Sequence, residues 1–98
     1  MTKQLKTYLS ILEQNQTFLR DRFSVNKIAI FGSTSRGDNT QRSDIDIFVE
    51  LTKPINLFAF LDLEKYLSSI LGRKVDLTTK KAIKPSVKPA IIKEAVYV

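Results

Sequence analysis

The sequence contains no cysteine and no histidine. Their absence excludes disulfide-stabilised scaffolds, zinc sites with thiolate or imidazole ligands, and catalysis of the Ser-His-Asp or Cys-His type. An enzyme with this sequence must therefore draw its chemistry from carboxylates, hydroxyls, lysine and arginine side chains, and bound metal.

Long hydrophobic runs are also missing. No apolar stretch approaches the ~20 residues that a membrane-spanning helix needs, and the polar segment after Met1 does not resemble a secretory signal. Internal repeats, low-complexity tracts and interdomain linkers are absent as well. With 98 residues, 43% of them hydrophobic, and a mean hydropathy of −0.11, the sequence predicts one small globular domain spanning residues 1–98, located in the cytoplasm.

Acidic residues are in the minority. Sixteen lysines and arginines against ten aspartates and glutamates give a net charge of +6. This charge favours anionic partners such as nucleotide phosphates, nucleic acid or an acidic protein. An ordinary solvated basic surface explains it equally well, because no dense run of basic residues marks a binding stripe. Nucleic acid is therefore not expected to be the main partner.

The spacing of apolar residues predicts three helices. Apolar positions recur every three or four residues over residues 2–22, apart from a gap near Gln16, and again over residues 57–71. Asn56 opens the second of these helices, and Gly72 ends it. A short last helix is expected over residues 88–95.

Three strands alternate with these helices. A short apolar run indicates a strand over residues 24–31, and apolar–polar alternation indicates strands over residues 44–51 and 74–79. Residues 32–42 are expected to form a turn with at most one helical turn, and Tyr97 to close a small edge pairing. The order indicates an α/β (α+β) domain with a small mixed β-sheet flanked by helices.

A glycine-serine turn stands at the end of the first predicted strand. Gly32 would let phosphates approach the backbone, and Ser33 would add a hydroxyl donor and a backbone N–H at a helix N-terminus. Arg36 would either neutralise phosphate or brace the turn, and Ser43 is a further candidate for nucleotide binding. A turn that simply needs a residue without Cβ is the structural alternative for Gly32.

Three aspartates are the candidate catalytic and metal-binding residues. Asp44 and Asp46 share one face of the second strand, since they are two residues apart. Val75 and Leu77 are expected to pack on the same core as that strand, which turns Asp76 toward the other two carboxylates. Oxygen-only ligands favour Mg²⁺ or Mn²⁺, and two ions ~3.5–4 Å apart would clamp an in-line phosphoryl displacement. Capping or solvent exposure is the structural alternative for each aspartate taken alone.

The motif of Gly32-Ser33, Asp44-x-Asp46 and Asp76 resembles the signature of the DNA polymerase beta-like nucleotidyltransferase superfamily. The shortness of the chain and its ending, residues 92–97, are similar to the minimal nucleotidyltransferase (MNT) group. The resemblance implies the polymerase-beta-like fold and an ATP-dependent enzyme that transfers AMP to an acceptor hydroxyl. It also implies that Gly32 and Ser33 hold the triphosphate and that Asp44 and Asp46 bind Mg²⁺. Asp76 would complete the metal site and help deprotonate the acceptor.

The resemblance further implies an antitoxin. Minimal members are commonly paired with a HEPN ribonuclease toxin, which they silence by binding it and by adding AMP to a tyrosine. Two alternatives stay open: an antitoxin that only masks its partner, and a nucleotidyltransferase that acts on RNA or a small molecule. Residues 57–61 are more apolar than one buried helix face needs, so part of them is expected to form a partner or dimer surface.

Overall fold

The computed structural model describes every residue from Met1 to Val98. Helices and strands follow one another in nearly the expected order. In chain order the elements are α1 (Lys3–Gln14), α2 (Gln16–Phe23), β1 (Val25–Phe31), α3 (Gly32–Arg36), β2 (Ile45–Leu51), α4 (Leu57–Leu71), β3 (Val75–Thr79), η1 (Lys80–Ala82), α5 (Lys88–Glu94) and β4 (Val96–Tyr97).

The four strands form one mixed sheet in the order β3-β2-β1-β4. β1 and β2 run antiparallel, and β2 and β3 run parallel with α4 as the crossover between them. β4 adds a short antiparallel pairing to β1, in which Tyr97 lies opposite Ala29. The predicted small mixed sheet and the predicted edge pairing at Tyr97 are therefore both confirmed.

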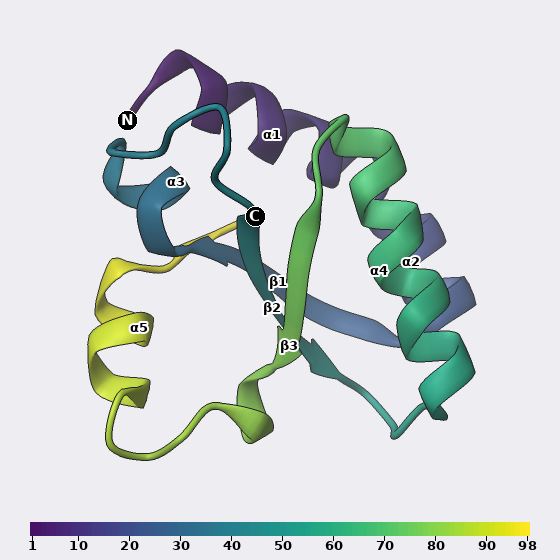
Figure 1. Cartoon of the computed structure of the whole chain (residues 1–98). Helices are drawn as coiled ribbons and strands as arrows, with labels where there is room; N and C mark the ends of the chain where they lie inside the picture. Colours follow the sequence, from purple (N-terminus) through teal and green to yellow (C-terminus); the bar gives the residue numbers. More distant parts are fainter.

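Helices α1, α2 and α4 cover one face of the sheet, while η1 and α5 lie on the other side (Figure 1). The first face carries the main core, because most apolar residues of the alternating strands, such as Ile30, Ile47 and Val75, point into it. Its fully buried members include Leu5, Leu12, Leu19, Ile30, Ile45, Ile47, Leu63, Leu67 and Val75.

The second face holds a smaller apolar cluster. Phe48 of β2 is fully buried there with Ala29 and Ile83. Its ring centroid lies 5.7 Å from that of Phe31 and 5.6 Å from that of Tyr97. This cluster covers the middle of the second face and leaves the end that carries Asp46 free for other contacts.

The prediction of a single helix over residues 2–22 is wrong in one respect, because this segment forms two helices, α1 and α2. α1 ends and α2 begins at Asn15, whose backbone N–H bonds to the Leu12 carbonyl rather than continuing the α-helical ladder. The Asn15 side chain donates to the Ile11 carbonyl at 2.8 Å and accepts a hydrogen bond from the Tyr66 hydroxyl of α4. A contact with a residue 51 positions away therefore stabilises the break.

Helix α4 spans the predicted residues, Leu57–Leu71. The Asn56 side chain accepts the backbone N–H of Ala59 at its start, and Gly72 ends it with a φ of +70°. Its first turns leave Leu57 and Phe58 67% and 79% exposed. None of the helices is both long and apolar enough to cross a membrane.

Candidate active site

The turn that follows β1 brings the backbone of Gly32 against the carboxylate of Asp46. Gly32 has a φ of +72°, and a Cβ placed on it would collide with Asp46 Oδ2. Glycine is therefore favoured twice: the positive φ strains any other residue, and a Cβ would displace the Asp46 carboxylate. The helix α3 that starts here is five residues long, which agrees with the single helical turn expected from the sequence.

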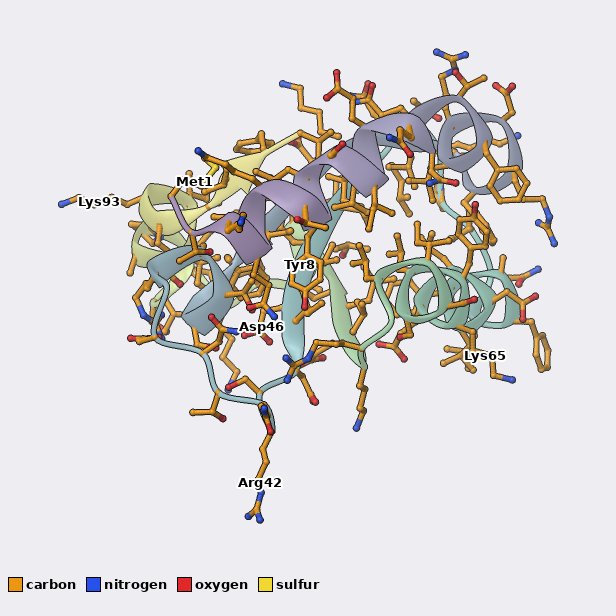
Figure 2. The ribbon with its side chains drawn as sticks, turned by 90° about the horizontal axis from the view of Figure 1, so that it is seen from above. Met1, Tyr8, Arg42, Asp46, Lys65 and Lys93 are labelled. Carbon is orange, nitrogen blue, oxygen red and sulfur yellow. The ribbon has the colours of Figure 1, made fainter.

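The three predicted aspartates gather at one end of β2 and β3. Asp46 and Asp76 are direct partners in the parallel register, so their side chains leave the same face of the sheet. Asp44 lies just before the first residue of β2 rather than within the strand, and its Oδ2 is 3.9 Å from Lys74 Nζ. Figure 2 shows Asp46 beside α3, while Arg42 on the following loop points away from the molecule.

Asp46 is the carboxylate whose electrostatic environment is most unusual. Burial raises the pKa of Asp46 above the ordinary aspartate value, and the charges of Asp76 and Asp44 raise it further. The positive charge of Arg36 opposes this effect only in part. The positive charges of the protein therefore compensate this half-buried carboxylate and its two acidic neighbours only in part.

The residues present fit a magnesium site that a nucleotide helps to complete. No group of three or more acidic side chains stands close enough to enclose an ion unaided. Mg²⁺ commonly binds through only one or two carboxylates and takes its other ligands from water and substrate phosphates. Asp44 and Asp46 supply oxygen ligands of that kind, next to the Gly32 turn where phosphates would lie.

Glu94 of α5 joins the site from the far end of the chain, and the sequence motif did not reveal it. Its Oε1 accepts the backbone N–H of Gly32 at 3.0 Å, and its Oε2 accepts a hydrogen bond from Arg36 Nη1 at 3.0 Å. Arg36 also pairs with Asp38 at 3.3 Å. Glu94 and then Asp38 raise the pKa of Arg36 above its ordinary value through these hydrogen bonds. Arg36 therefore braces the turn, one of the two roles expected for it.

The loop between α3 and β2 has its own bracing residues. Ser43 Oγ accepts the backbone N–H of Thr40 at 2.9 Å, so Ser43 stabilises the loop, and its contact with nucleotide stays a prediction. Arg73 donates to the carbonyls of Thr40 and Ser43 at 3.0 and 3.1 Å. This role of Arg73 also had no signal in the sequence, because it depends on a loop 30 residues earlier.

Ser33 lies at the first turn of α3, as predicted. Its backbone carbonyl accepts the N–H groups of Gly37 and Asp38 at 2.9 and 3.1 Å, which closes the turn. The Ser35 hydroxyl donates to the Gly32 carbonyl at 2.8 Å. The Ser33 hydroxyl makes no hydrogen bond within the protein, so it is free to meet a ligand.

Comparison with known proteins identifies the class of this site. The nucleotidyltransferase domain family matches residues 12–98. The chain belongs to this family of enzymes, and the aspartates and glycine turn described above lie within the matched range. Its relatives narrow the class further, since those that match over most of its length are named protein adenylyltransferases.

Two relatives represent this group. Protein adenylyltransferase MntA of Thermococcus cleftensis is 40% identical over 89 residues, which cover 91% of this chain and 90% of the relative. A Methanocaldococcus jannaschii protein, provisionally named a protein adenylyltransferase, is 41% identical over 97 residues, covering 98% and 99% of the two chains. This chain is thus a minimal nucleotidyltransferase of the MntA kind.

Solved structures agree with this assignment. A structure provisionally assigned as a minimal nucleotidyltransferase superposes with a TM-score of 0.77 at 25% identity and covers 94% of this chain and 93% of the other. A chain of a toxin–antitoxin complex crystallised with AMP-PNP gives a TM-score of 0.71 at 27% identity, covering 87% of this chain and 69% of the other. The predicted fold is therefore confirmed.

Proposed function

We propose that this chain is an antitoxin that transfers AMP from ATP to a hydroxyl, most simply a tyrosine, of a HEPN-type toxin. The observation that carries the proposal is the contact of the Gly32 backbone with the Asp46 carboxylate, with Asp76 paired to Asp46 across the sheet. Phosphate-binding backbone and metal-binding oxygens then lie within one site. The similarity to named protein adenylyltransferases and to a toxin–antitoxin chain with AMP-PNP supports the choice of nucleotide and partner.

Each group has a proposed role in the transfer. Gly32 and Ser33 would bind the triphosphate, and Asp44 and Asp46 would hold Mg²⁺ or Mn²⁺. Asp76 would complete the metal site. Bound metal would offset negative charge on the phosphate oxygens. Asp76, which is exposed at the open end of the sheet, accepts the proton of the acceptor hydroxyl. The acceptor oxygen forms a bond to the α-phosphorus while the bond from that phosphorus to pyrophosphate breaks.

The proposal is tested by intact-mass measurement of the protein encoded by the neighbouring gene, which we expect to be the toxin. The toxin is incubated with this chain, ATP and Mg²⁺, and we expect its mass to rise by whole AMP units. Peptide mapping should place the added AMP on a tyrosine. The matched control is Asp44→Asn combined with Asp46→Asn, which removes two charges with little change of shape and should abolish the mass increase.

The same experiment separates the alternatives. A stable complex without any mass increase would replace the proposal with an antitoxin that acts only by binding. Neither complex nor mass increase would direct attention to RNA or small-molecule acceptors. Steep salt dependence of RNA binding would then favour the former.

A further inference from the structure

A basic groove lies at the opposite end of the strands from Asp46, and none of the roles above uses it. It has a volume of about 890 Å³ and runs between the β2–α4 connection and the end of β3 with η1. Four lysines line it: Lys53, Lys80, Lys81 and Lys88. We refer to this hollow as the basic groove.

The charge of the basic groove is largely uncompensated. Glu50 is its only acidic residue, and it pairs with Lys80 at 3.7 Å. Lys53, Lys81 and Lys88 form no ion pair in the structure. Clustered positive charge without internal partners favours an occupant that carries negative charge.

Apolar side chains continue from the rim of the groove onto the surface of α4. Leu57 lines the groove and is 67% exposed, and Phe58 and Leu61 next to it on α4 are 79% and 45% exposed. These are the apolar residues that the sequence assigned to a partner surface, and their exposure is consistent with that interpretation. Neighbouring exposed apolar side chains of this size indicate a protein-binding surface.

One wall of the groove continues the catalytic face, while Leu77 and Phe60 line the groove from the side of the main core. Glu50 follows Asp46 and Phe48 on the same face of β2, and Thr78 and Lys80 continue the face that carries Asp76 on β3. Glu50 lies four positions after Asp46 along the strand, a distance of about 13 Å. A partner bound in the groove is therefore near the reacting atoms without touching them.

We propose that the basic groove, together with Leu57, Phe58 and Leu61, binds an acidic, amphipathic segment of the protein that this chain nucleotidylates. The lysines would pair with its carboxylates, and the exposed side chains of α4 would pack on its apolar residues. A nucleic acid fits less well, because two of the three exposed apolar side chains are aliphatic and give bases no surface on which to stack. The identity of the partner rests on the proposed function, whereas the location of the binding surface does not.

The first test reverses charge in the groove. Lys53→Glu combined with Lys81→Glu should weaken binding of the adjacent-gene toxin about tenfold or more at low salt, mainly through slower association. The matched control is Lys3→Glu with Lys6→Glu, which makes the same change of net charge on exposed residues of α1. Equal weakening by both pairs, or by neither, would overturn the proposal.

A second variant tests the apolar part. Leu57→Ser with Phe58→Ser changes side chains that are mostly solvent-exposed, so the variant should fold. It should dissociate from the toxin several-fold faster than the wild type. Hydrogen exchange in the complex should show protection of residues 52–61 and 78–88, and protection confined to other segments would contradict the proposal.

These results are distinguishable from failure of the proposed function. If the toxin binds through the groove but never gains AMP, the binding surface stands and the transfer activity fails. If the toxin gains AMP and neither groove variant alters its affinity, the activity stands and the binding surface is wrong. Loss of RNA binding instead of toxin binding in the charge-reversal variant would also overturn the proposal.

Discussion

The backbone of Gly32 and the carboxylate of Asp46 share a space that one methyl group would fill. At the scale of single residues, this contact explains why the turn and the Asp-x-Asp pair belong to one site. The sequence indicated the turn and the Asp-x-Asp pair through the spacing of their residues along the chain. It did not indicate that they touch, because the contact depends on how β1 and β2 pair.

Gly32→Ala should therefore lower both stability and activity. The positive φ alone costs a non-glycine residue about 1–2 kcal/mol, and displacement of Asp46 adds to that cost. Gly72→Ala is the matched control, since Gly72 has a similar φ of +70° and nothing within 4 Å of an added Cβ. Denaturant unfolding should show a larger loss for Gly32→Ala, and AMP transfer should fall only in that variant. Equal losses of stability would contradict the proposed crowding.

Asp46 should make stability depend on pH. Its pKa is raised in the folded protein, so the fold binds this proton more tightly than the unfolded chain does. The resulting stabilisation is complete below the ordinary pKa of 3.8 and is lost as the pH rises through the raised value. Asp46→Asn, which does not titrate, should gain stability relative to the wild type as the pH rises from 3.8 through the raised pKa of Asp46, and the gain should level off above it. Unfolding in chelator-containing buffer at several pH values measures this difference, and a constant difference would contradict it.

Glu94 positions the turn from α5. Glu94→Ala leaves the buried Gly32 N–H without its acceptor, which should cost about 1–3 kcal/mol of unfolding free energy. Glu94→Gln can still accept that hydrogen bond and should lose less. Both variants should raise the KM for ATP more than they lower kcat, because Glu94 orients the turn that we propose binds phosphate. Unchanged KM values in both would exclude this role.

At the scale of helices and strands, residue spacing and capping residues predicted most element boundaries. The prediction failed where a contact with a distant residue sets the boundary. The limits of α4 follow from Asn56 and Gly72, which act within their own turns. The break at Asn15 depends on Tyr66, and the role of Glu94 depends on Gly32, 62 residues earlier. Periodicity carries no information about such pairs, so the sequence could not predict them.

The end of α2 contains a residue whose backbone conformation favours glycine. Ser24 ends the helix with a φ of +60°, a left-handed conformation that favours glycine. Its carbonyl accepts the Thr52 N–H at 2.8 Å, and a glycine would keep this bond. Ser24→Gly should therefore stabilise the protein by about 0.5–1 kcal/mol, while Ser24→Ala should give no gain. Thermal unfolding of both variants measures the effect, and a lower melting temperature for Ser24→Gly would contradict it.

At the scale of the whole molecule, one face of the sheet serves packing and the other carries the candidate site. The face under α1, α2 and α4 buries the main core, and the other face carries the aspartates at one end. The basic groove opens at the opposite end of the strands and is lined from both sides of the sheet. The alternation in β2 and β3 predicted this division, including the side on which Asp76 lies. The groove itself could not be predicted, because its lysines come from separate segments that only the fold brings together.

We propose that this one site moves AMP, rather than phosphate, onto its partner toxin. The most direct measurement compares ATP labelled at the α-phosphate with ATP labelled at the γ-phosphate, using the wild type and the Asp44→Asn, Asp46→Asn double variant. We predict that the α-label alone appears on the toxin and that the double variant transfers none. Transfer of the γ-label, or an α-label that persists in the double variant, would contradict the account.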